Sequence, residues 1–576
     1  QEKFEEDVSL FIQSCAAFEE SIEQASRATV VAEFLQLRLD FKKMEFLIAH
    51  TDPQLFNQCL NGAPLPKVMQ KVPDLSIIEP QGLQRIEEVV YTDNFDRTEL
   101  TQLFKKFHFS MKQFEKSLKS RRLYDADVFE AVRLGLIRLN TLNVTGFDAP
   151  ANSDKVNHES IQILKGMKSI LENYFEFSHE TKTSELAAIF DTGIQQLEEE
   201  TFESFDHLSF LTNVINPLWK STLILQKELN VELPSLRSSL PKHINYEAEN
   251  LFAENFLNAS TFGEFAEGDE SEKHIELGRK LFFDPLLSGD KKMACATCHD
   301  PKKAFTDGLP TSRTNAGLSG KRNSPTLLNA VYATRYFHDV RTDRLSLQMD
   351  HVVYNPDEFA TDYDEMIAKL NQSEEYQKMF NEVYGSMKIT KQSVTNAMSR
   401  YVSSLRSFNS DFDKFVRGET KTISESVKRG YNLFQGKATC ATCHFAPTFA
   451  GVVPPFYDET ETEVLGVPKI FKEPYELDDD PGRYANNIIM EKAPFYERSF
   501  KTPTLRNIAL TGPYMHNGSF ETLEEVIDFY DAGGGVGLGL DVPYQTLPGD
   551  SLKLSDQEKE DIIHFLEALT DTTGMN

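Results

Sequence analysis

Apolar side chains recur at helical spacing along the first 240 residues of the chain. The clearest stretches are Phe34, Leu37, Phe41 and Met44, and further on Phe104, Phe107, Met111 and Phe114. Steps of three and four residues place such side chains on one face of an α-helix. Because strong turn signals are sparse there, the pattern predicts a bundle of six or more helices.

The second half of the chain carries an internal repeat. Its paired motifs are, in order, G-x-x-L-F at 278–282 and 430–434, C-A-T-C-H at 295–299 and 440–444, P-T-L-x-N at 325–329 and 503–507, and YFHD or YMHN at 336–339 and 514–517. Each copy closes on an amphipathic helix, predicted over 393–408 and 555–569, and Ser555 with Glu558 forms a capping box for the second. Another helix is predicted over 521–532, where a run of glycines ends it.

The repeated C-A-T-C-H motif is the attachment signature of haem c. Its two cysteines form thioethers with the porphyrin, and the adjacent histidine ligates the iron. The residues concerned are Cys295, Cys298 and His299 in the first copy and Cys440, Cys443 and His444 in the second. Two such motifs, 145 residues apart, predict two covalently attached haem c groups. Because haem c attachment occurs outside the cytoplasm, we expect the protein in the periplasm or at the cell surface.

These features predict an all-α protein of three units. Helix, CxxCH, long loop and closing helix is the order in which a small cytochrome c domain is assembled. We therefore expect an N-terminal helical bundle at residues 1–240, followed by two tandem cytochrome c-like domains. The first, residues 241–418, would hold the first haem, and the second, residues 419–576, would hold the second haem.

Composition and charge add limits on location and partners. The chain has no run of about 18 apolar residues, so no membrane span is expected. Its formal charge of −29 repels nucleic acid and anionic lipid; it suits a basic protein partner, or it is only a solvated acidic surface. The chain begins at Gln1 without a signal-like segment, which we interpret as an exported product whose signal has been removed. Two further cysteines, Cys15 and Cys59, form a disulfide or are buried thiols.

The repeat allows the ligands of the two irons to be compared. Tyr530 lies fourteen residues after His516, on the apolar face of its predicted helix. The same offset from His338 reaches Val352, and valine cannot ligate iron. Tyr530 is therefore a candidate ligand of the second iron, although its spacing fits a core tyrosine equally well. Met515 is a rival ligand, because thioether sulfur is a normal partner of haem iron, but its place in the YMHN turn favours a packing role.

The haem-region motifs also identify a family. They read CATCHDPKKAFTDG, RNSPTLLNA, NPDEF, KTPTLRNIALTGPYMHNG and TLEEVIDFYDAGG. In these motifs and their order, the region from about residue 270 to 572 resembles the bacterial dihaem cytochrome c peroxidase family, which includes MauG. The resemblance implies an enzyme that reduces hydrogen peroxide. Many members have Met at the position of Tyr530, whereas MauG has Tyr, so the resemblance favours Tyr530 as the ligand of the second iron.

The resemblance assigns roles around the first haem. Many members carry a His that caps this iron; here residues 306–323 contain no His, and Asn315 falls where it would be. The open side of the iron is therefore expected to be available to peroxide. Glu358 in NPDEF is implied as the group that moves a proton from the near to the far peroxide oxygen, with Gln348 positioning the peroxide by hydrogen bonding.

Two further features lie between the haems. The family motif F-W-D-G-R reads FHDVR here, so His338 replaces a Trp. Because imidazole is harder to oxidise than indole, this change weighs against sharing of oxidising equivalents between the haems, and leaves a conducting contact or simple packing. The resemblance also implies a calcium ion, bound by the Asn323 side chain and the Thr511 and Pro513 carbonyls, with a turn and a cap as the alternative.

The N-terminal half has a second, partial resemblance. The stretch GLQRIEEVVY, from Gly82, is similar to the G-x-H-x-x-E stretch of imelysin-like helical domains, which are periplasmic modules linked to iron. Gln84 replaces the His, whereas Glu87 is retained. Because Gln is a poor iron ligand, an acidic helical docking module is expected rather than a metal site.

The leading hypothesis is a periplasmic dihaem c-type peroxidase. It would reduce hydrogen peroxide at the open first haem, with electrons that a small donor protein, a cytochrome or a cupredoxin, delivers through the second haem. One alternative is a MauG-like oxidase that uses peroxide to oxidise a protein or a natural product; Tyr530 favours it, and the missing Trp weighs against it. The other is a non-enzymatic dihaem electron-transfer protein, in which Glu358 and Gln348 would be dispensable.

Overall fold

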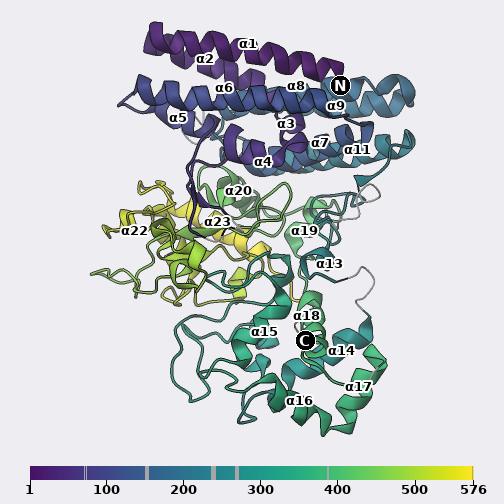
Figure 1. Cartoon of the computed structure of the whole chain (residues 1–576), viewed down its shortest axis with the longest axis vertical. Helices are drawn as coiled ribbons and strands as arrows, with labels where there is room; N and C mark the ends of the chain where they lie inside the picture. Colours follow the sequence, from purple (N-terminus) through teal and green to yellow (C-terminus); the bar gives the residue numbers. More distant parts are fainter. Residues whose placement is uncertain are drawn as a thin grey trace.

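The structure, a computed structural model, describes residues 1–69, 72, 74–149, 155–234, 242–265, 271–385, 388–573 and 575. The described chain is mostly helical, as the predicted fold class requires. Helices of the first half form a layer at one end, the C-terminal part lies directly beneath it, and the region of α14 to α18 lies farthest from it (Figure 1). The expected boundary between residues 240 and 241 falls outside the described residues.

The first half contains long helices with short turns between them. Its elements are α1 (Glu2–Gln24), α2 (Arg27–Lys42), α3 (Glu45–Thr51), α4 (Pro53–Leu55), η1 (Phe56–Leu60), β1 (Lys67–Val68), β2 (Ile77–Ile78), α5 (Leu83–Tyr91), α6 (Arg97–Ser120), α7 (Asp125–Arg138), η2 (Leu139–Asn143), α8 (Val156–Glu172), η4 (Phe175–Phe177), α9 (Glu180–Glu199), α10 (His207–Phe210), η5 (Leu211–Ile215) and α11 (Asn216–Glu228). The two stretches of apolar spacing lie largely on helices α2 and α6, where Phe34, Phe41, Phe104 and Phe114 are fully buried. The Asp96 carboxylate caps α6 by accepting from the Thr98 N–H at 2.7 Å.

The second half repeats one set of elements. Its first part has α13 (Ala259–Phe262), α14 (Glu272–Phe283), η6 (Pro285–Leu287), η7 (Cys295–Thr297), η8 (Pro301–Lys303), η9 (Ala330–Tyr332), α15 (Leu345–Val353), α16 (Tyr363–Asn371), α17 (Glu374–Tyr384) and α18 (Lys391–Ser404). Its second part has α19 (Asp411–Val416), α20 (Glu425–Gln435), η10 (Cys440–Thr442), β3 (Thr462–Val464), η11 (Arg483–Ala485), η12 (Ile489–Glu491), η13 (Pro494–Tyr496), β4 (Ser499–Lys501), η14 (Ile508–Leu510), α21 (Leu523–Asp531), α22 (Gly534–Gly537) and α23 (Asp556–Ala568). The strands pair as two short antiparallel hairpins, β1 with β2 and β3 with β4.

Equivalent glycines let the two helix pairs of the repeat cross closely. Helix α14 packs on α18, and α20 packs on α23. A Cβ atom at Gly278 would lie 2.0 Å from the Ala397 carbonyl oxygen, and one at Gly430 would lie 1.9 Å from that of Asp561. Neither distance is compatible with a side chain, which explains the glycine of each G-x-x-L-F motif.

The P-T-L-x-N turns also match in backbone geometry. Asn329 and Asn507, their last residues, have left-handed φ angles of 59° and 61°, a region that Asn tolerates better than most residues. The Asn329 amide donates to the Ser407 carbonyl at 3.0 Å, and the Asn507 amide donates to the Ser407 hydroxyl at 2.7 Å. Both copies of the turn therefore hold one residue, which fixes them relative to each other.

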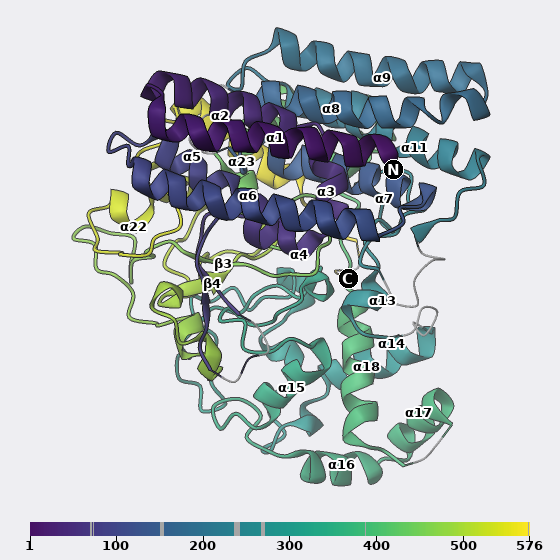
Figure 2. The same ribbon diagram turned by 45° about the horizontal axis from the view of Figure 1, so that its top comes forward.

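A hydrophobic core joins the N-terminal helices to the second CxxCH region. Phe252, downstream of these helices, contacts Phe412 and Phe449, with ring centroids 5.9 and 6.0 Å apart. The same cluster extends to Phe565 of α23, whereas the first CxxCH region has a separate core around residues such as Met366. The N-terminal helices thus pack with the second copy of the repeat: Figure 1 shows them above α20 and α23, and in Figure 2 α23 lies behind them.

The remaining expectations concern membranes and cysteines. Within the described ranges, no helix is long and apolar enough to cross a membrane. Cys15 on α1 is a buried free thiol, and Cys59 in η1 is a partly buried free thiol. The alternative of a Cys15–Cys59 disulfide therefore does not hold in this structure.

Candidate active site

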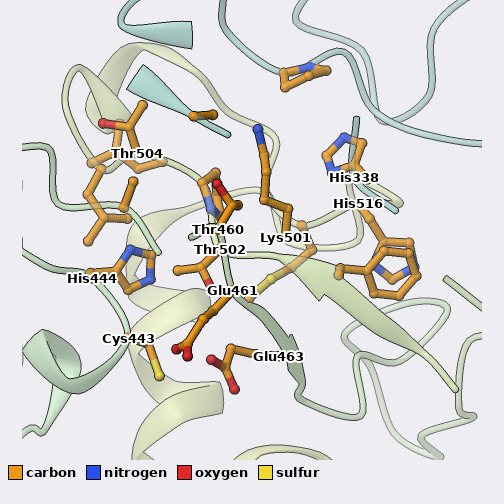
Figure 3. A pocket seen from close by; sticks show the side chains of 18 of the residues that line it. His338, Cys443, His444, Thr460, Glu461, Glu463, Lys501, Thr502, Thr504 and His516 are labelled. Carbon is orange, nitrogen blue, oxygen red and sulfur yellow. The ribbon is translucent and has the colours of Figure 1, made fainter. Parts of the chain in front are cut away.

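Both CxxCH motifs open into a cavity of about 850 Å³. Its lining includes every residue that the sequence analysis assigned to a haem, to peroxide or to calcium. These residues come from elements far apart in the sequence, namely the turns η7 and η10, the helices α15 and α21, and the loops around η14. Figure 3 shows part of this pocket around Cys443 and His444.

The two motif histidines are oriented alike. The Nδ1 atom of His299 lies 3.0 Å from the Phe305 carbonyl oxygen, and Nδ1 of His444 lies 3.0 Å from that of Phe449. A carbonyl partner makes Nδ1 the protonated nitrogen, which leaves Nε2 as the metal-binding atom. Burial lowers the pKa of both imidazoles, that of His444 to about 4, so that each is neutral and able to ligate iron.

The cysteines complete two equivalent haem c sites. Cys295 and Cys440 each begin a short 3₁₀ turn, η7 or η10, and Cys298 and Cys443 follow these turns directly. All four thiols line the cavity beside the oriented histidines. The residues therefore fit two haem c groups, each held by two thioethers and one imidazole.

Glu358 and Gln348 lie on the first-haem side of the cavity. Gln348 is on α15, and Glu358 follows this helix in a loop. The Asn355 amide donates to Glu358 Oε1 at 2.7 Å. Burial raises the pKa of the Glu358 carboxyl, which also interacts electrostatically with Cys295 and Cys298. A carboxyl with a raised pKa beside a reaction site is suited to accepting and returning a proton.

Asn315 packs against the loop that carries Glu358. Its amide donates to the Pro356 carbonyl at 2.8 Å, and its N–H donates to the Asp357 carbonyl at 2.9 Å. Val352, the counterpart of Tyr530 in the repeat, lines the cavity with an aliphatic side chain. On the first-haem side, neither of these two positions presents an iron-ligating side chain to the cavity.

Tyr530 and Met515 lie together on the second-haem side. Tyr530 is in the last turn of α21, whose predicted capping box is present, with Thr522 accepting from the Glu525 N–H at 3.3 Å. Burial and the nearby Cys443 raise the pKa of the Tyr530 phenol. Met515 lines the same cavity, and both side chains pack against one apolar cluster.

Acidic side chains add negative charge at this end of the cavity. Glu461, just before β3, and Glu463, within β3, line the pocket with Cys443 (Figure 3). Burial, with the nearby Glu461 carboxylate, raises the pKa of Glu463 to about 7. The repeat comparison had not assigned either residue a role.

A hydrogen-bonded connection joins the two haem sites. His338 Nε2 lies 3.0 Å from the Asn323 carbonyl oxygen, and the His338 carbonyl accepts from the Lys501 N–H at 2.7 Å. In the other direction, the Asn323 N–H donates to the His516 carbonyl at 2.7 Å. Burial lowers the pKa of His338 to about 3, so that its imidazole is neutral.

Lys501 is a site residue that the sequence analysis missed. Its side chain extends into the pocket (Figure 3), and burial lowers its pKa to about 8. The available signal was its alignment with Asn323 in the repeat, two residues before the P-T-L-x-N motif in each copy.

The proposed calcium ligands are also brought together. The Asn323 Nδ2 donates to the Pro513 carbonyl at 3.3 Å and to the Leu309 carbonyl at 2.8 Å, so its amide nitrogen, and not its Oδ1, faces these two oxygens. Thr511 lines the same part of the cavity. The oxygen atoms of these residues are of the kind that calcium prefers.

The imelysin-like stretch contributes to a buried ion cluster. Glu87 pairs with Arg38 at 3.1 Å, and Arg38 pairs with Glu159 at 2.6 Å. The Gln84 amide donates to the Asn61 carbonyl at 3.3 Å. Across the residues that the structure describes, no group of three or more His, Cys, Asp or Glu side chains is arranged to hold a metal.

Comparison with known proteins supports the assignment of the CxxCH region to a dihaem protein. Residues 272–421 match the family described as di-haem cytochrome c peroxidase. The cytochrome-c peroxidase IdrP2 of Denitromonas iodatirespirans is 33% identical over 317 residues, which is 51% of this chain and 81% of that protein. The methylamine utilization protein MauG of Methylophilus methylotrophus is 32% identical over 297 residues, again 51% of this chain and 81% of that protein.

A solved structure of a MauG-like protein associated with microbial copper homeostasis is also similar. It is 28% identical, with a TM-score of 0.46, over 53% of this chain and 91% of that chain. Two CxxCH motifs with similarly oriented histidines in one cavity define a dihaem c-type protein. The family match and the identity to IdrP2 and MauG show that the chain belongs to the dihaem cytochrome c peroxidase family, as its motifs indicated, and that it is an oxidoreductase of the peroxidase type.

Proposed function

We propose that the protein reduces hydrogen peroxide at the first haem site with electrons that arrive through the second. Two electrons and two protons convert one hydrogen peroxide into two molecules of water. Haem iron supplies the electrons that cleave the O–O bond. The observation that carries the proposal is the asymmetry of the repeat, because Glu358 and Gln348 line the cavity beside the first motif and Tyr530 lines it beside the second.

At the first site the chain holds the reactant and moves the proton. Val352 offers no iron-ligating group, so a haem held by His299 would keep a coordination position available to peroxide. Gln348 positions the peroxide by hydrogen bonding. Glu358 takes a proton from the near oxygen and returns it to the far oxygen, so that water leaves when the O–O bond breaks. The buried position of Glu358 supports this role, because desolvation raises its pKa toward neutrality.

At the second site, Tyr530 would be a second ligand of the haem iron in addition to His444, and Met515 would be a packing residue. A small donor protein, a cytochrome or a cupredoxin, would supply electrons here, and His338 with its hydrogen bonds would connect the two sites. Calcium bound by Asn323, Thr511 and Pro513 would stabilise the junction between them.

The proposed organisation follows the sequence analysis. Residues 1–240 form the helical bundle, residues 241–418 the domain of the first haem, and residues 419–576 the domain of the second. The protein would work in the periplasm or at the cell surface, where haem c is attached. A MauG-like oxidase acting on a protein or natural product is the alternative that Tyr530 favours.

Exchange of Glu358 for Gln tests the proposal. Glu358→Gln keeps the size of the side chain but removes its ability to accept a proton, so we expect peroxide turnover to fall by about 10²–10⁴-fold. The control is Glu276→Gln, the same exchange at an exposed position on α14. Haem spectra of both variants should match the unmodified protein. Full turnover by Glu358→Gln would reject the proton-transfer role of Glu358, whereas an unmodified holoprotein without peroxide turnover would favour a plain electron-transfer protein.

A further inference from the structure

Part of the wall of the second haem site comes from the N-terminal half of the chain. Segments 63–67 and 145–149 line the same cavity as Cys440, Cys443 and His444. The Phe147 ring meets the ring of Phe445, the residue after His444, edge to face with centroids 5.8 Å apart. The turn η2 packs against η10, the turn that begins at Cys440. The N-terminal half therefore reaches the haem-attachment turn itself.

An ion pair holds segment 63–67 against the second haem domain. The Lys67 ammonium lies 3.4 Å from Glu461 Oε1 and 3.5 Å from Glu459 Oε2. Glu461 lines the cavity just before β3 (Figure 3), and Lys67 begins β1. The first wall segment is thus attached at its outer end to the protein around the cavity.

The buried ion cluster holds segment 145–149 through Asp148, and it holds the residues that lead into segment 63–67. The Asp148 carboxylate accepts from Lys42, and from the Asn143 amide at 2.7 Å. The Asp148 carbonyl accepts from the Arg38 guanidinium at 2.9 Å. At the start of segment 63–67, the Asn61 amide donates to Glu45 Oε1 at 2.8 Å.

These charges are deeply buried and closely paired. Arg38, Lys42 and Glu45 are each no more than 1% exposed. Buried charges are tolerated only with such pairing, and losing one partner is strongly destabilising. The buried carboxylates of the cluster, Glu45, Glu87, Asp148 and Glu159, are paired with three cations of the chain itself, Arg38, Lys42 and Arg138. The paired buried charges of the cluster therefore fix the positions of the two chain segments that contact them.

We propose that the N-terminal half is a structural part of the second haem site. The ion cluster positions segments 63–67 and 145–149. These two segments, and the Phe147 ring in particular, exclude water from one side of the second haem. The inference rests on the proposed function in one respect, namely that Cys440 and Cys443 carry haem c. It also implies that an electron donor approaches the second haem from another side.

Removal of the Phe147 ring tests the wall in the full-length holoprotein. Phe147→Ala admits water beside the second haem, and Phe177→Ala is the control, because Phe177 lies in the same half but is 68% exposed. The measurement is the ratio of ferric to ferrous second haem at a fixed ambient potential. With a phenolate ligand the ferric centre is neutral and the ferrous centre is anionic, so water favours the ferrous form. We expect the ratio to fall at least about threefold in Phe147→Ala, where a tenfold change corresponds to 59 mV.

The possible outcomes separate this inference from the proposed function. A ratio equal to that of the unmodified protein and of Phe177→Ala would contradict the proposal that Phe147 excludes water from the second haem. A rise of similar size would support the exclusion of water but would contradict a phenolate ligand. Mass spectrometry of the peptide containing Cys440 and Cys443 reports whether haem is attached at all, and its absence would overturn both proposals.

A second variant tests the anchoring role of the ion cluster. Asn61→Ala removes the amide that donates to Glu45, but it leaves every charged partner of the cluster in place. We expect the ferric-to-ferrous ratio to move in the same direction as in Phe147→Ala, with the first haem unchanged. An Asn61→Ala protein with both haems attached and an unchanged ratio would overturn the positioning role of the cluster.

Discussion

The buried pair of Asp413 and Arg506 gives a quantitative test of how the second haem region is held. Both Arg506 terminal nitrogens donate to the Asp413 carboxylate at 2.8 Å, and neither side chain is exposed. The Arg506 Nε donates to the Pro447 carbonyl at 2.8 Å, only three residues after His444. The pair therefore supports the loop that follows the second CxxCH motif.

Asp413→Asn should destabilise this region strongly. It removes the negative charge and leaves the Arg506 guanidinium buried without its ionic partner. Breaking a buried pair in this way costs about 3–5 kcal/mol of unfolding free energy. The assay is denaturant unfolding of the holoprotein, followed at the absorption of the second haem. A cost below about 1 kcal/mol, the value typical of exposed pairs, would refute the reasoning.

The same helix supplies the control. Asp411, two residues earlier on α19, pairs with Lys414 at 3.5 Å, but its side chain is 88% exposed. Asp411→Asn makes the identical chemical change at the surface, so the unfolding midpoint should not move. An equal shift in both variants would mean that the helix, and not the buried pair, is the sensitive element.

The Asp413–Arg506 pair also predicts that the free energy of unfolding depends on pH. Burial alone would raise the pKa of Asp413, but the Arg506 guanidinium and the Ser410 hydrogen bonds outweigh it, so that the pKa stays below its usual value. A carboxyl with a depressed folded-state pKa stabilises the fold above its unfolded-state pKa of about 3.9. This stability is lost as the pH falls through the folded-state value, and Asp413→Asn should lack that acid-dependent part.

Two further predictions concern the ligands and the calcium ion. Tyr530→Met should raise the reduction potential of the second haem, because a neutral thioether stabilises ferric iron less than a phenolate does; a redox titration with an unchanged potential would identify Met515 or another residue as the ligand. If calcium binds at the proposed site, a chelator should lower peroxide turnover, and calcium should restore it better than magnesium does, because calcium accepts oxygen ligands in less regular geometry than magnesium. Turnover that is indifferent to the chelator would leave Asn323, Thr511 and Pro513 as a turn and a cap.

The local features of the fold could be predicted well from the sequence. The helix expected over 555–569 is found as α23 (Asp556–Ala568), and Ser555 accepts from the Glu558 N–H at 3.3 Å as its capping box requires. The helix expected over 393–408 is found at Lys391–Ser404. Helical periodicity, N-caps and the glycines that end helices depend on residues close together in the sequence, so they can be recognised in a single chain.

The tertiary arrangement could not be predicted in the same way. The sequence analysis placed the two haem domains in tandem, but it did not indicate that the N-terminal helices share a core with the second. Phe147 and Phe445 are about 300 residues apart in the chain, and no local pattern relates them. Likewise, no local pattern marks Arg38 and Lys42 as buried, and only their contacts with carboxylates distant in the sequence show the ion cluster.

The catalytic positions required the repeat and the family motifs. An isolated Glu358 in a loop has no signature of its own, whereas NPDEF in family order does. Lys501 was missed because its burial, which lowers its pKa, depends on the tertiary structure and has no local sequence pattern. Comparison of the two copies position by position, which identified Val352 and Tyr530, was the most productive inference from the sequence.

Low-temperature EPR of the oxidised holoprotein, before and after one equivalent of hydrogen peroxide, tests the central claim most directly. We expect one high-spin and one low-spin ferric haem, with the high-spin signal lost when peroxide is added. That result means that the first haem is open without prior reduction, as Val352 and Asn315 imply. Two low-spin haems that stay inert until the protein is half reduced would contradict the open first site, and a ligand other than these residues would then cap the first iron.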